Sequence, residues 1–497
     1  MTDGRFASLQ ERLGPALAAN RQGSSTDHVM IALPSYSVSE SLLSHYADRI
    51  PSLEHRYLLA MFVAARIPSC EVVYISSRRP EPEVIDYYTS LLPPRGPSDP
   101  PHRVRFVECD DGTPRSVAAR LVDHPRLLDE LRGMVAGRPA LIEPWNVTEH
   151  EVALAIALDI PINGTDPALR PLGFKSAGRH LFREAGVPVP FGVEDVRTVD
   201  DVVRAIETIR GARPGVRGVV IKHDDSGAGD GNMVVDLSPL ASAPDATSWL
   251  RSTVGTLPSW YLADLERGGI VEERIAGTHF TSPSAQVDVR PDGTVAVLAT
   301  HEQVLGGESG QVYLGCRFPA DPAYAAELAR HAAAIGERYA AAGAIGRLAV
   351  DFVAASDDGH QWQVFALEVN LRKGGTTHPY ALLRNLVPGR YDAEEARWIV
   401  AADGSSRCYS ATDNLVDPRW TGLPPAAVIE AVRAAGLEFN RRTSTGVVLH
   451  MLSGLAIDGR LGLTAIAPTS AEAQQLEAAT RDVIDSVVGS GVGAGRA

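Results

Sequence analysis

The sequence predicts a protein of mixed α/β and α+β class, and three observations support this prediction. Residues 28–160 alternate short apolar runs with amphipathic stretches, which is typical of a parallel sheet with crossover helices. Two β-branched segments then flank a glycine-rich loop, which indicates an antiparallel strand pair. A further strand pair and a helix follow residue 400. We therefore divide the 497 residues into three predicted units, at 1–163, 164–400 and 401–497.

The first unit is expected to be a Rossmann-like domain. Its predicted strands are HVMIALP, EVVYISS, RVRFVEC and ALIEP, and its clearest predicted helices are HRYLLAMFVAARI and PRLLDELRGMVAG. No G-x-G-x-x-G pattern follows any of these strands. We therefore expect no working dinucleotide site in this domain.

The second unit is predicted to begin with two helices and to continue mainly as strands. The helices are GFKSAGRHLFREAGVPVP and VDDVVRAIETIRG, and the strands include GVVIK, NMVVD, GGIVEERI, RLAVDFVAA and QVFALEVNL. In the third unit, TGVVLHMLSGLAIDGRLGLTAIA predicts a hairpin that turns at Asp458-Gly459. The segment SAEAQQLEAATRDVIDSVV predicts the helix that follows it.

Composition excludes several classes of function. The net charge of −14 argues against general binding to nucleic acid or to an anionic membrane. No stretch of 18 apolar residues predicts a membrane span, and the first 20 residues lack the apolar core of a signal peptide. The four cysteines are scattered without metal-ligand spacing. Reduced thiols and a cytoplasmic location are the expectation.

Lysine is rare in this chain, and its positions are informative. Of 47 basic residues only Lys175, Lys222 and Lys373 are lysines. A preference for arginine should remove lysines wherever either cation serves. Lysine is a compact charge with three rotatable donors, which suits phosphate oxygens in a tight site. The three lysines are therefore candidates for a functional site, and the alternative is that they survived by chance on the surface.

The segment SGAGDG, residues 226–231, is a candidate phosphate-binding loop. It is neither a P-loop nor a dinucleotide motif, because both need a helix next and the strand NMVVD follows. A glycine-rich hairpin loop can instead close over phosphates with its backbone N–H groups. The alternative is a flexible surface turn. The candidate contacts are Lys222, Ser226, Gly227, Gly229 and Gly231.

A cluster of oxygen ligands is predicted where two strands pair. The strands RLAVDFV and FALEVNL, joined by a turn, would bring Asp351 beside Glu368 and Asn370. Two carboxylates and an amide oxygen suit Mg²⁺, which is commonly shared with substrate phosphates. Arg372 lies two positions further and could stabilise charge on a reacting group. The alternative is a solvated strand face.

The segment IVEERIAG is a candidate hinge. Its backbone near Glu272, Glu273 and Ile275 could bind an adenine edge, although an ordinary strand end would have the same sequence character.

Taken in order, these elements resemble the ATP-grasp superfamily over about residues 165–395. The resemblance implies ATP held between two lobes, with Lys175 and Lys222 on the phosphates and a glycine-rich lid. It also implies an adenine hinge at Glu272, Glu273 and Ile275, and Mg²⁺ ligands at Asp351, Glu368 and Asn370. Where the family often carries a ribose-binding glutamate, this sequence has His279. The form EVNLRKGGTTHP and the flanking units look like the peptide ligases of pheganomycin biosynthesis.

That resemblance implies an ADP-forming peptide ligase. A small-molecule carboxylic acid, such as an α-guanidino acid, would be activated as an acylphosphate and joined to the amino end of a peptide. Catalytic roles are expected for Arg372 and Lys222, and loops 225–231 and 306–311 are expected to act as lids. Whether the protein acts as a monomer or a homodimer stays open. The candidate substrate contacts are Gln303, Arg372, Lys373 and His378.

Other functions remain compatible with the same residues. A carboxylase or a carboxylate–thiol ligase would share every ATP contact, and a kinase would pass phosphate to a stable acceptor. A non-catalytic nucleotide-binding partner is a fourth alternative, but the intact set of cations and oxygen ligands argues against it.

Overall fold

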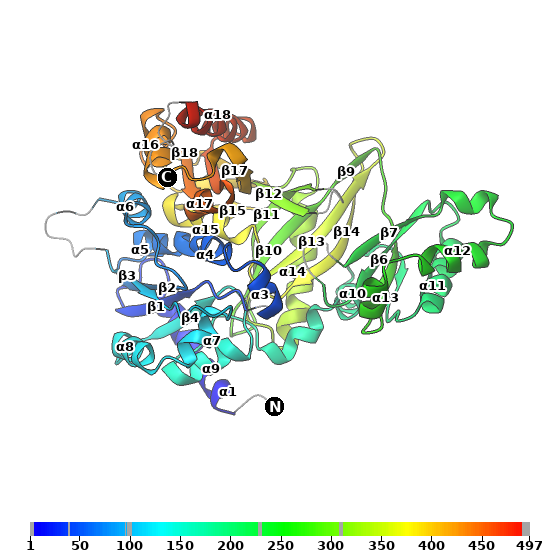
Figure 1. Ribbon diagram of the computed structural model, residues 1–497, viewed down its shortest axis with the longest axis horizontal. Helices are drawn as coiled ribbons and strands as arrows, with labels where there is room; N and C mark the ends of the chain where they lie inside the picture. Colours follow the sequence, from blue (N-terminus) through cyan, green and yellow to red (C-terminus); the bar gives the residue numbers. More distant parts are fainter. Residues whose placement is uncertain are drawn as a thin grey trace.

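The computed structural model describes residues 4–37, 40–94, 96, 102–226, 231–307 and 312–489. The N-terminal unit is a parallel four-stranded sheet in the order β3-β2-β1-β4 (Figure 1, blue to cyan). Its strands are β1 His28–Leu33, β2 Cys70–Ser76, β3 Val104–Glu108 and β4 Ala140–Pro144. The four predicted strands are confirmed. β1 and β2 are buried along their whole length, as expected for apolar runs covered by helices on both faces.

The single helix predicted over residues 55–67 is divided in the structure into a 3-10 segment and a short α-helix, and another short α-helix precedes them. Residues 50–66 form α4 Ile50–His55, the 3-10 helix η1 Arg56–Phe62 and α5 Val63–Arg66. The other helices are α1 Gly4–Gln10, α2 Leu13–Ala19, α3 Glu40–His45, α6 Pro82–Ser90, α7 Val117–Val122, α8 Pro125–Val135 and α9 Glu149–Leu158.

A small antiparallel sheet follows, in the order β5-β8-β6-β7 (Figure 1, green). Its strands are β5 Gly192–Val193, β6 Gly218–His223, β7 Asn232–Asp236 and β8 Gly269–Glu273. β6 and β7 pair from Gly218↔Asp236 to Lys222↔Asn232, so the predicted glycine-loop hairpin is confirmed. The helical segments of this region are η2 Pro167–Gly173, α10 Lys175–Glu184, α11 Val199–Ala212, η3 Ser238–Ser242, α12 Ala246–Gly255 and α13 Ser259–Leu265.

The remaining strands form one sheet of eleven, with the path β14-β13-β10-β11-β12-β17-β16-β15. β9 pairs with β13, and β19 joins β17 to β18. Because β12 pairs with β17, this sheet continues across residue 400. Its strands are β9 His279–Thr281, β10 Pro283–Val289, β11 Val295–Gly306, β12 Val312–Phe318, β13 Gly346–Ser356, β14 Gln363–Asn370, β15 Gly389–Asp392, β16 Arg397–Val400, β17 Ser406–Val416, β18 Gly446–His450 and β19 Arg460–Ala467.

One predicted turn is wrong. β18 and β19 do pair in antiparallel fashion, but Asp458-Gly459 is not a two-residue hairpin turn. The chain between the strands forms η5 Leu452–Gly454 and α17 Leu455–Asp458, and Gly459 ends α17 in a left-handed conformation with φ of 68°. An aspartate before a left-handed glycine fits both a turn and a helix end, so the dipeptide alone does not decide between them. The other helical segments are α14 Ala325–Ala341, α15 Thr377–Leu386, η4 Pro418–Trp420, α16 Pro425–Ala434 and α18 Ser470–Gly489.

The largest apolar core joins parts of the chain that lie far apart in sequence. It contains side chains of η1, α6, α15 and β18, so the N-terminal unit packs directly against the last strands. The four cysteines are buried, and none forms a disulfide. Among the described residues, no helix combines the length and the apolar character that a membrane crossing needs.

Candidate active site

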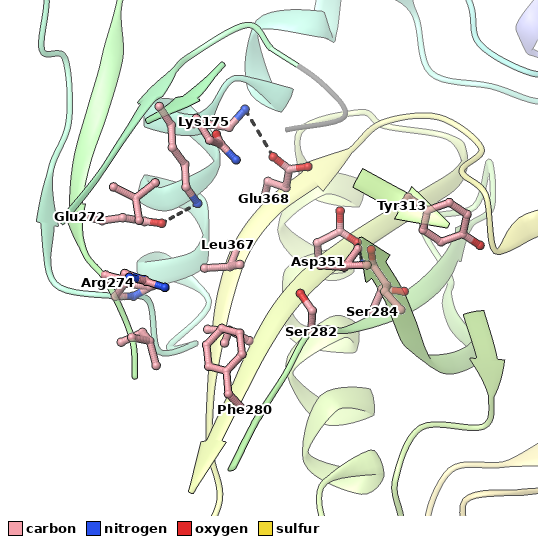
Figure 2. Close-up of a pocket in the computed structure, with 18 of the residues that line it drawn as sticks. Lys175, Glu272, Arg274, Phe280, Ser282, Ser284, Tyr313, Asp351, Leu367 and Glu368 are labelled. Atoms are coloured by element: carbon pink, nitrogen blue, oxygen red, sulfur yellow. Dashed lines mark hydrogen bonds and ion pairs between the residues drawn. The ribbon is translucent and has the colours of Figure 1, made fainter. Parts of the chain in front are cut away.

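A cleft of about 1100 Å³ lies between the small sheet and the large sheet. It is lined by side chains from β6, β7 and β8 on one side and from β10 to β14 on the other (Figure 2). Most of the predicted site residues meet there, although they come from segments about 200 residues apart. The predicted residues that line the cleft are Lys175, Lys222, Glu272, Glu273, Ile275, Gln303, Asp351, Glu368, Asn370 and Arg372.

The predicted oxygen cluster forms on the hairpin of β13 and β14. Asp351 and Glu368 are directly paired across the two strands, and Asn370 pairs with Ala349 two residues along. Asp351 accepts hydrogen bonds from the side-chain amides of Gln303 at 2.7 Å and Asn370 at 3.2 Å. Burial, and then the negative charge of Glu368, raise the pKa of Asp351 above its ordinary value. A divalent cation between these oxygens would relieve that repulsion, so the donor set fits Mg²⁺.

Two of the three lysines face this cluster from different elements. Lys175, the first residue of α10, has its Nζ 3.3 Å from Glu368 Oε2 and donates to the backbone and side-chain oxygens of Ser226, each at 3.0 Å. Lys222 on β6 has its Nζ 2.5 Å from Glu272 Oε1. Burial opposes ionisation of Glu368, but Lys175 and Lys222 outweigh it and hold the pKa of that carboxyl below its ordinary value. The three lysines, Lys373 included, are buried, which contradicts the surface alternative.

The predicted hinge segment connects the small sheet to the large sheet. β8 ends at Glu273, and β9, on the large sheet, begins at His279. The Glu272 carboxylate is buried and bridges Lys222 to Arg179, whose NH1 lies 2.6 Å from Oε2. The Glu272 carboxylate therefore holds Lys222 in place. Any contact of this segment with an adenine edge is left to its backbone. His279 is exposed and does not line the cleft, whereas Phe280 does.

The glycine-rich loop is described only at its ends. Gly227 and Gly229 lie outside the described residues, as do residues 308–311 of the second predicted lid. Gly231 does not line the cleft; a Cβ there would stand 2.3 Å from the Ser226 hydroxyl, so glycine is needed for the hairpin to close. Ser226 bonds to Lys175, as described above.

Two of the predicted substrate contacts, Lys373 and His378, do not line the cleft. Lys373 does not line the cleft: its Nζ lies 2.7 Å from Glu143 Oε1 and donates to the Pro144 carbonyl, at the end of β4. His378 is buried, with Nε2 3.0 Å from Asp413 Oδ1. The alternation of side chains along β14 does not predict where these two residues lie, because the chain leaves the strand after Asn370. Both side chains connect units of the fold instead.

Several cleft residues were not predicted. Arg56 comes from the N-terminal unit, and its segment shows only the apolar pattern of a packed helix. Arg274 lies inside the predicted hinge segment and Phe280 lies three residues beyond its end, and Figure 2 shows both near Leu367. Both residues lie in or close to the predicted hinge in the sequence, but no feature of the sequence there marks them as residues of the cleft. The unpredicted lining residues with polar, charged or aromatic side chains include Arg56, Arg217, Arg274, Phe280, Ser282, Ser284 and Tyr313.

Comparison with known proteins identifies the families and relatives that this chain resembles. Residues 255–394 match the family model described as IQCH-like, ATP-grasp, and residues 427–480 match the one described as PGM1 C-terminal domain. The chain is 33% identical over 445 residues to the L-propargylglycine–L-glutamate ligase of Streptantibioticus cattleyicolor, covering 85% of this chain and 89% of that protein. It is 24% identical to the IQ motif-containing protein H of Danio rerio, over 62% of this chain but only 34% of that protein.

Solved structures show the same fold. The biotin carboxylase of Campylobacter jejuni matches with a TM-score of 0.53 at 13% identity, over 93% of this chain and 95% of that one. The biotin carboxylase domain of the Hydrogenobacter thermophilus 2-oxoglutarate carboxylase, in complex with MgADP, ADP and bicarbonate, matches with a TM-score of 0.52 at 14% identity, over 92% and 89%. With an identity of 33% over most of both chains, the protein belongs to the family of ATP-grasp ligases that includes the L-propargylglycine–L-glutamate ligase.

Proposed function

We propose that this protein is an ADP-forming carboxylate–amine ligase that activates an acid as its acylphosphate and makes a peptide bond, using ATP and Mg²⁺. The observation that carries the proposal is the meeting of Lys175, Lys222 and Arg372 with the Asp351–Glu368 pair in one cleft. Cations and oxygen ligands in this combination suit phosphoryl transfer between anions.

In the first step a carboxylate oxygen attacks the γ-phosphorus of ATP, and ADP leaves. Lys175 and Lys222 hold the phosphate oxygens, and their burial keeps water from competing for those contacts. Asp351, Glu368 and Asn370 would hold the Mg²⁺ ion, which supplies neutralisation of phosphate charge when bound. Arg372 faces the same carboxylates and stabilises the acylphosphate that forms.

In the second step a neutral amine attacks the acyl carbon, phosphate leaves, and one proton is lost from the nitrogen. Negative charge develops on the carbonyl oxygen before phosphate departs, and Arg372 is placed to stabilise it. Acylphosphates hydrolyse, so the two sheets must enclose the reaction.

The substrates are proposed as amino-acid derivatives. The relative's name combines two amino acids, L-propargylglycine and L-glutamate, which supports an acid of this class and an amine from an amino acid or a peptide. An α-guanidino acid remains a candidate donor, in peptide natural-product biosynthesis. The enzyme is further proposed to act in the cytoplasm.

Product analysis with an isotope label tests the proposal. The acid is supplied with ¹⁸O in its carboxylate, together with ATP, Mg²⁺ and a panel of amines. One ¹⁸O should appear in inorganic phosphate for each C–N bond formed, with ADP as the nucleotide product. Label in AMP, or release of pyrophosphate, would reject the acylphosphate route. Labelled phosphate without any C–N product would reject the ligase assignment.

A further inference from the structure

A guanidinium from the N-terminal unit reaches the same cleft. Arg56, at the start of η1, lines the cleft although its side chain is only 10% exposed. Its NH1 lies 2.6 Å from Asp413 Oδ2, and its NH2 donates to the Tyr36 hydroxyl at 2.6 Å. Among the described residues, its buried Nε finds no hydrogen-bond partner. Arg56 is therefore a buried cation with unused donor capacity at the wall of a substrate cleft.

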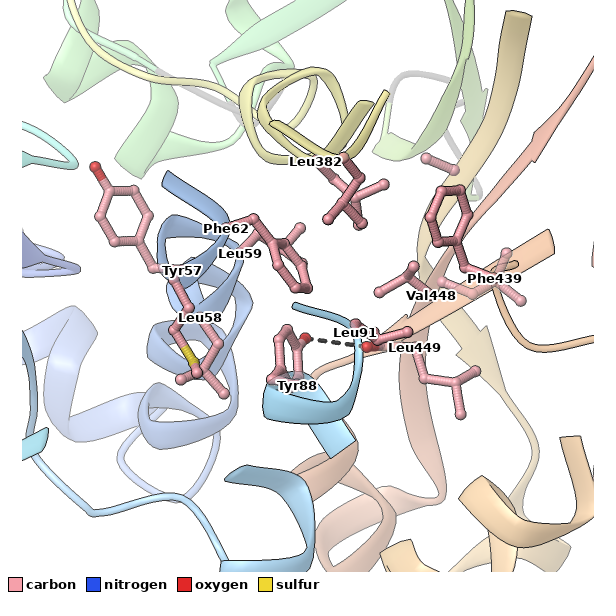
Figure 3. Packing of buried hydrophobic residues seen from close by; sticks show 14 of the residues in the cluster. Tyr57, Leu58, Leu59, Phe62, Tyr88, Leu91, Leu382, Phe439, Val448 and Leu449 are labelled. Carbon is pink, nitrogen blue, oxygen red and sulfur yellow. Dashed lines mark hydrogen bonds between the residues drawn. The ribbon is translucent and has the colours of Figure 1, made fainter. Parts of the chain in front are cut away.

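Arg56 is also held rigidly. Its guanidinium carbon stacks 4.5 Å from the Trp145 ring and 5.7 Å from the Tyr36 ring. Asp413, its ion-pair partner on β17, has its Oδ1 2.8 Å from His450 Nε2 as well. Figure 3 shows the η1 side chains Tyr57, Leu58 and Phe62 in the core shared with Tyr88 and Leu449. An arginine fixed in this way loses little rotamer entropy on binding an anion.

Two further features at this end of the cleft favour an anion. Arg372 lines the cleft too, and burial, with a smaller contribution from the charge of Arg56, lowers the pKa of its guanidinium. The ten-residue helix α15 begins at Thr377, and the three residues before it, 374–376, also line the cleft. The positive end of a helix therefore opens toward the same space.

This end lies away from the nucleotide contacts. Figure 2 shows Lys175 and Glu272 on one side of Glu368, with Ser284 and Tyr313 beyond Asp351 on the other. Tyr313 packs on Gly375, where a Cβ would stand 2.4 Å from its ring. The Ser284 hydroxyl is buried and has no hydrogen-bond partner among the described residues. The arrangement leaves space and polar groups for a second substrate beyond the reacting carboxylate.

We infer that Arg56, Arg372 and the α15 N-terminus bind a carboxylate of the amine acceptor. The inference rests on the proposed function and specifies its second substrate: an amine with a carboxylate only a few atoms away. A free α-amino acid has this chemistry, and so does a peptide whose first residue is acidic. A donor with a single carboxylate is the poorer fit, because that carboxylate is consumed in the reaction and the donor's amino or guanidino group would be repelled by two guanidinium groups. The same positive field favours the neutral, nucleophilic form of the acceptor amine.

The test compares acceptors that differ by one charge. Wild-type enzyme is assayed with glutamate and glutamate α-amide, and with dipeptides that begin with Glu or with Gln. Loss of the recognised carboxylate should lower kcat/KM by about 10- to 100-fold, mainly through KM, since charge-assisted hydrogen bonds are lost. The first pair reports on a free α-carboxylate, and the second pair reports on an acidic first side chain.

A paired variant assigns the effect to Arg56. R56M/D413N removes both buried charges together, so neither is left uncompensated, and it should abolish the discrimination while ADP remains the product. Arg217→Met, which removes an exposed cleft arginine beside β6, should keep the acid-over-amide ratio. Equal use of acid and amide by wild type in both pairs would overturn the inference alone, as would full discrimination in R56M/D413N. Absence of ligation with every acceptor would overturn the proposed function, and the inference with it.

Discussion

At the scale of single residues, Glu368 is the carboxylate on which the contacts of the cleft converge. It faces Lys175 at 3.3 Å and is paired across the hairpin with Asp351. Glu368→Gln keeps the size of the side chain but removes its charge, so it should lower kcat by on the order of 10³-fold or more with little effect on folding. ADP release and circular dichroism measure the two effects. Asp357→Asn, on the turn between β13 and β14, is the control, and near-normal turnover in folded Glu368→Gln protein would exclude the metal role.

A second residue, Glu54, makes the stability of the fold depend on pH. Its Oε2 accepts from the backbone N–H and the hydroxyl of Ser77, both at 2.7 Å. Burial raises its pKa from 4.5 to about 7, with the Ser77 hydrogen bonds opposing the shift. The pKa of Glu54 is higher in the folded state than in the unfolded state. The protonated carboxyl therefore contributes to the stability of the fold below about pH 4.5, and this contribution is lost as pH rises through about 7.

Glu54→Gln removes the titrating carboxyl and should therefore abolish the loss of stability that accompanies a rise in pH. Relative to wild type, its free energy of unfolding should improve by about 3 kcal/mol between pH 4.5 and pH 8. Urea unfolding at several pH values measures this, and Glu130→Gln on the exposed face of α8 is the matched control. A constant difference between Glu54→Gln and wild type across this range would contradict the prediction.

At the scale of elements, the paired strands were predictable and the connections between them were not. The β13–β14 hairpin follows from alternation and a turn, and that alone placed Asp351 opposite Glu368. Lys373 directly follows Arg372 in sequence, yet it lies beyond the last strand residue and bonds to β4. Alternation holds only while the strand lasts, so a residue three positions past Asn370 could not be placed by it.

Lys373 is accordingly predicted to join elements. Its ammonium is buried between Glu143 and the Pro144 carbonyl, 5.9 Å from the Tyr57 ring centroid. Lys373→Met leaves the Glu143 carboxylate without its partner and should lower the free energy of unfolding by about 3–5 kcal/mol. The double variant K373M/E143Q removes both charges and should recover much of that loss. A raised KM for either substrate with unchanged urea stability would instead support the original substrate role.

At the scale of the whole molecule, the site exists only because distant segments converge. Lysine rarity identified Lys175 and Lys222, since that signal depends on composition and not on contacts. Arg56 and Asp413 could not be found this way, because each belongs to a segment with an ordinary pattern and only the shared core brings them together. Long-range packing of this kind leaves no local periodicity in one sequence.

The same convergence predicts how the nucleotide should stabilise the fold. Lys222 lies on the small sheet and Glu368 on the large sheet, so an ATP analogue bound with Mg²⁺ would connect them. A ligand at 100 times its Kd stabilises the folded state by about 2.7 kcal/mol. The Tm should therefore rise with a non-hydrolysable ATP analogue, and rise further with Mg²⁺ than with EDTA. Glu368→Gln should remove only the Mg²⁺ increment.

Lys222→Arg completes this experiment. Its larger, planar head group does not fit beside Glu272, where the ammonium lies at 2.5 Å, so it should reduce the whole nucleotide-dependent rise. Arg338→Lys, at an exposed position of α14 that does not line the cleft, should leave the rise unchanged. Calorimetric titration of the analogue gives the matching Kd values. A Mg²⁺ increment that survives in Glu368→Gln would place the metal elsewhere, and full analogue affinity in Lys222→Arg would remove that lysine from the phosphates.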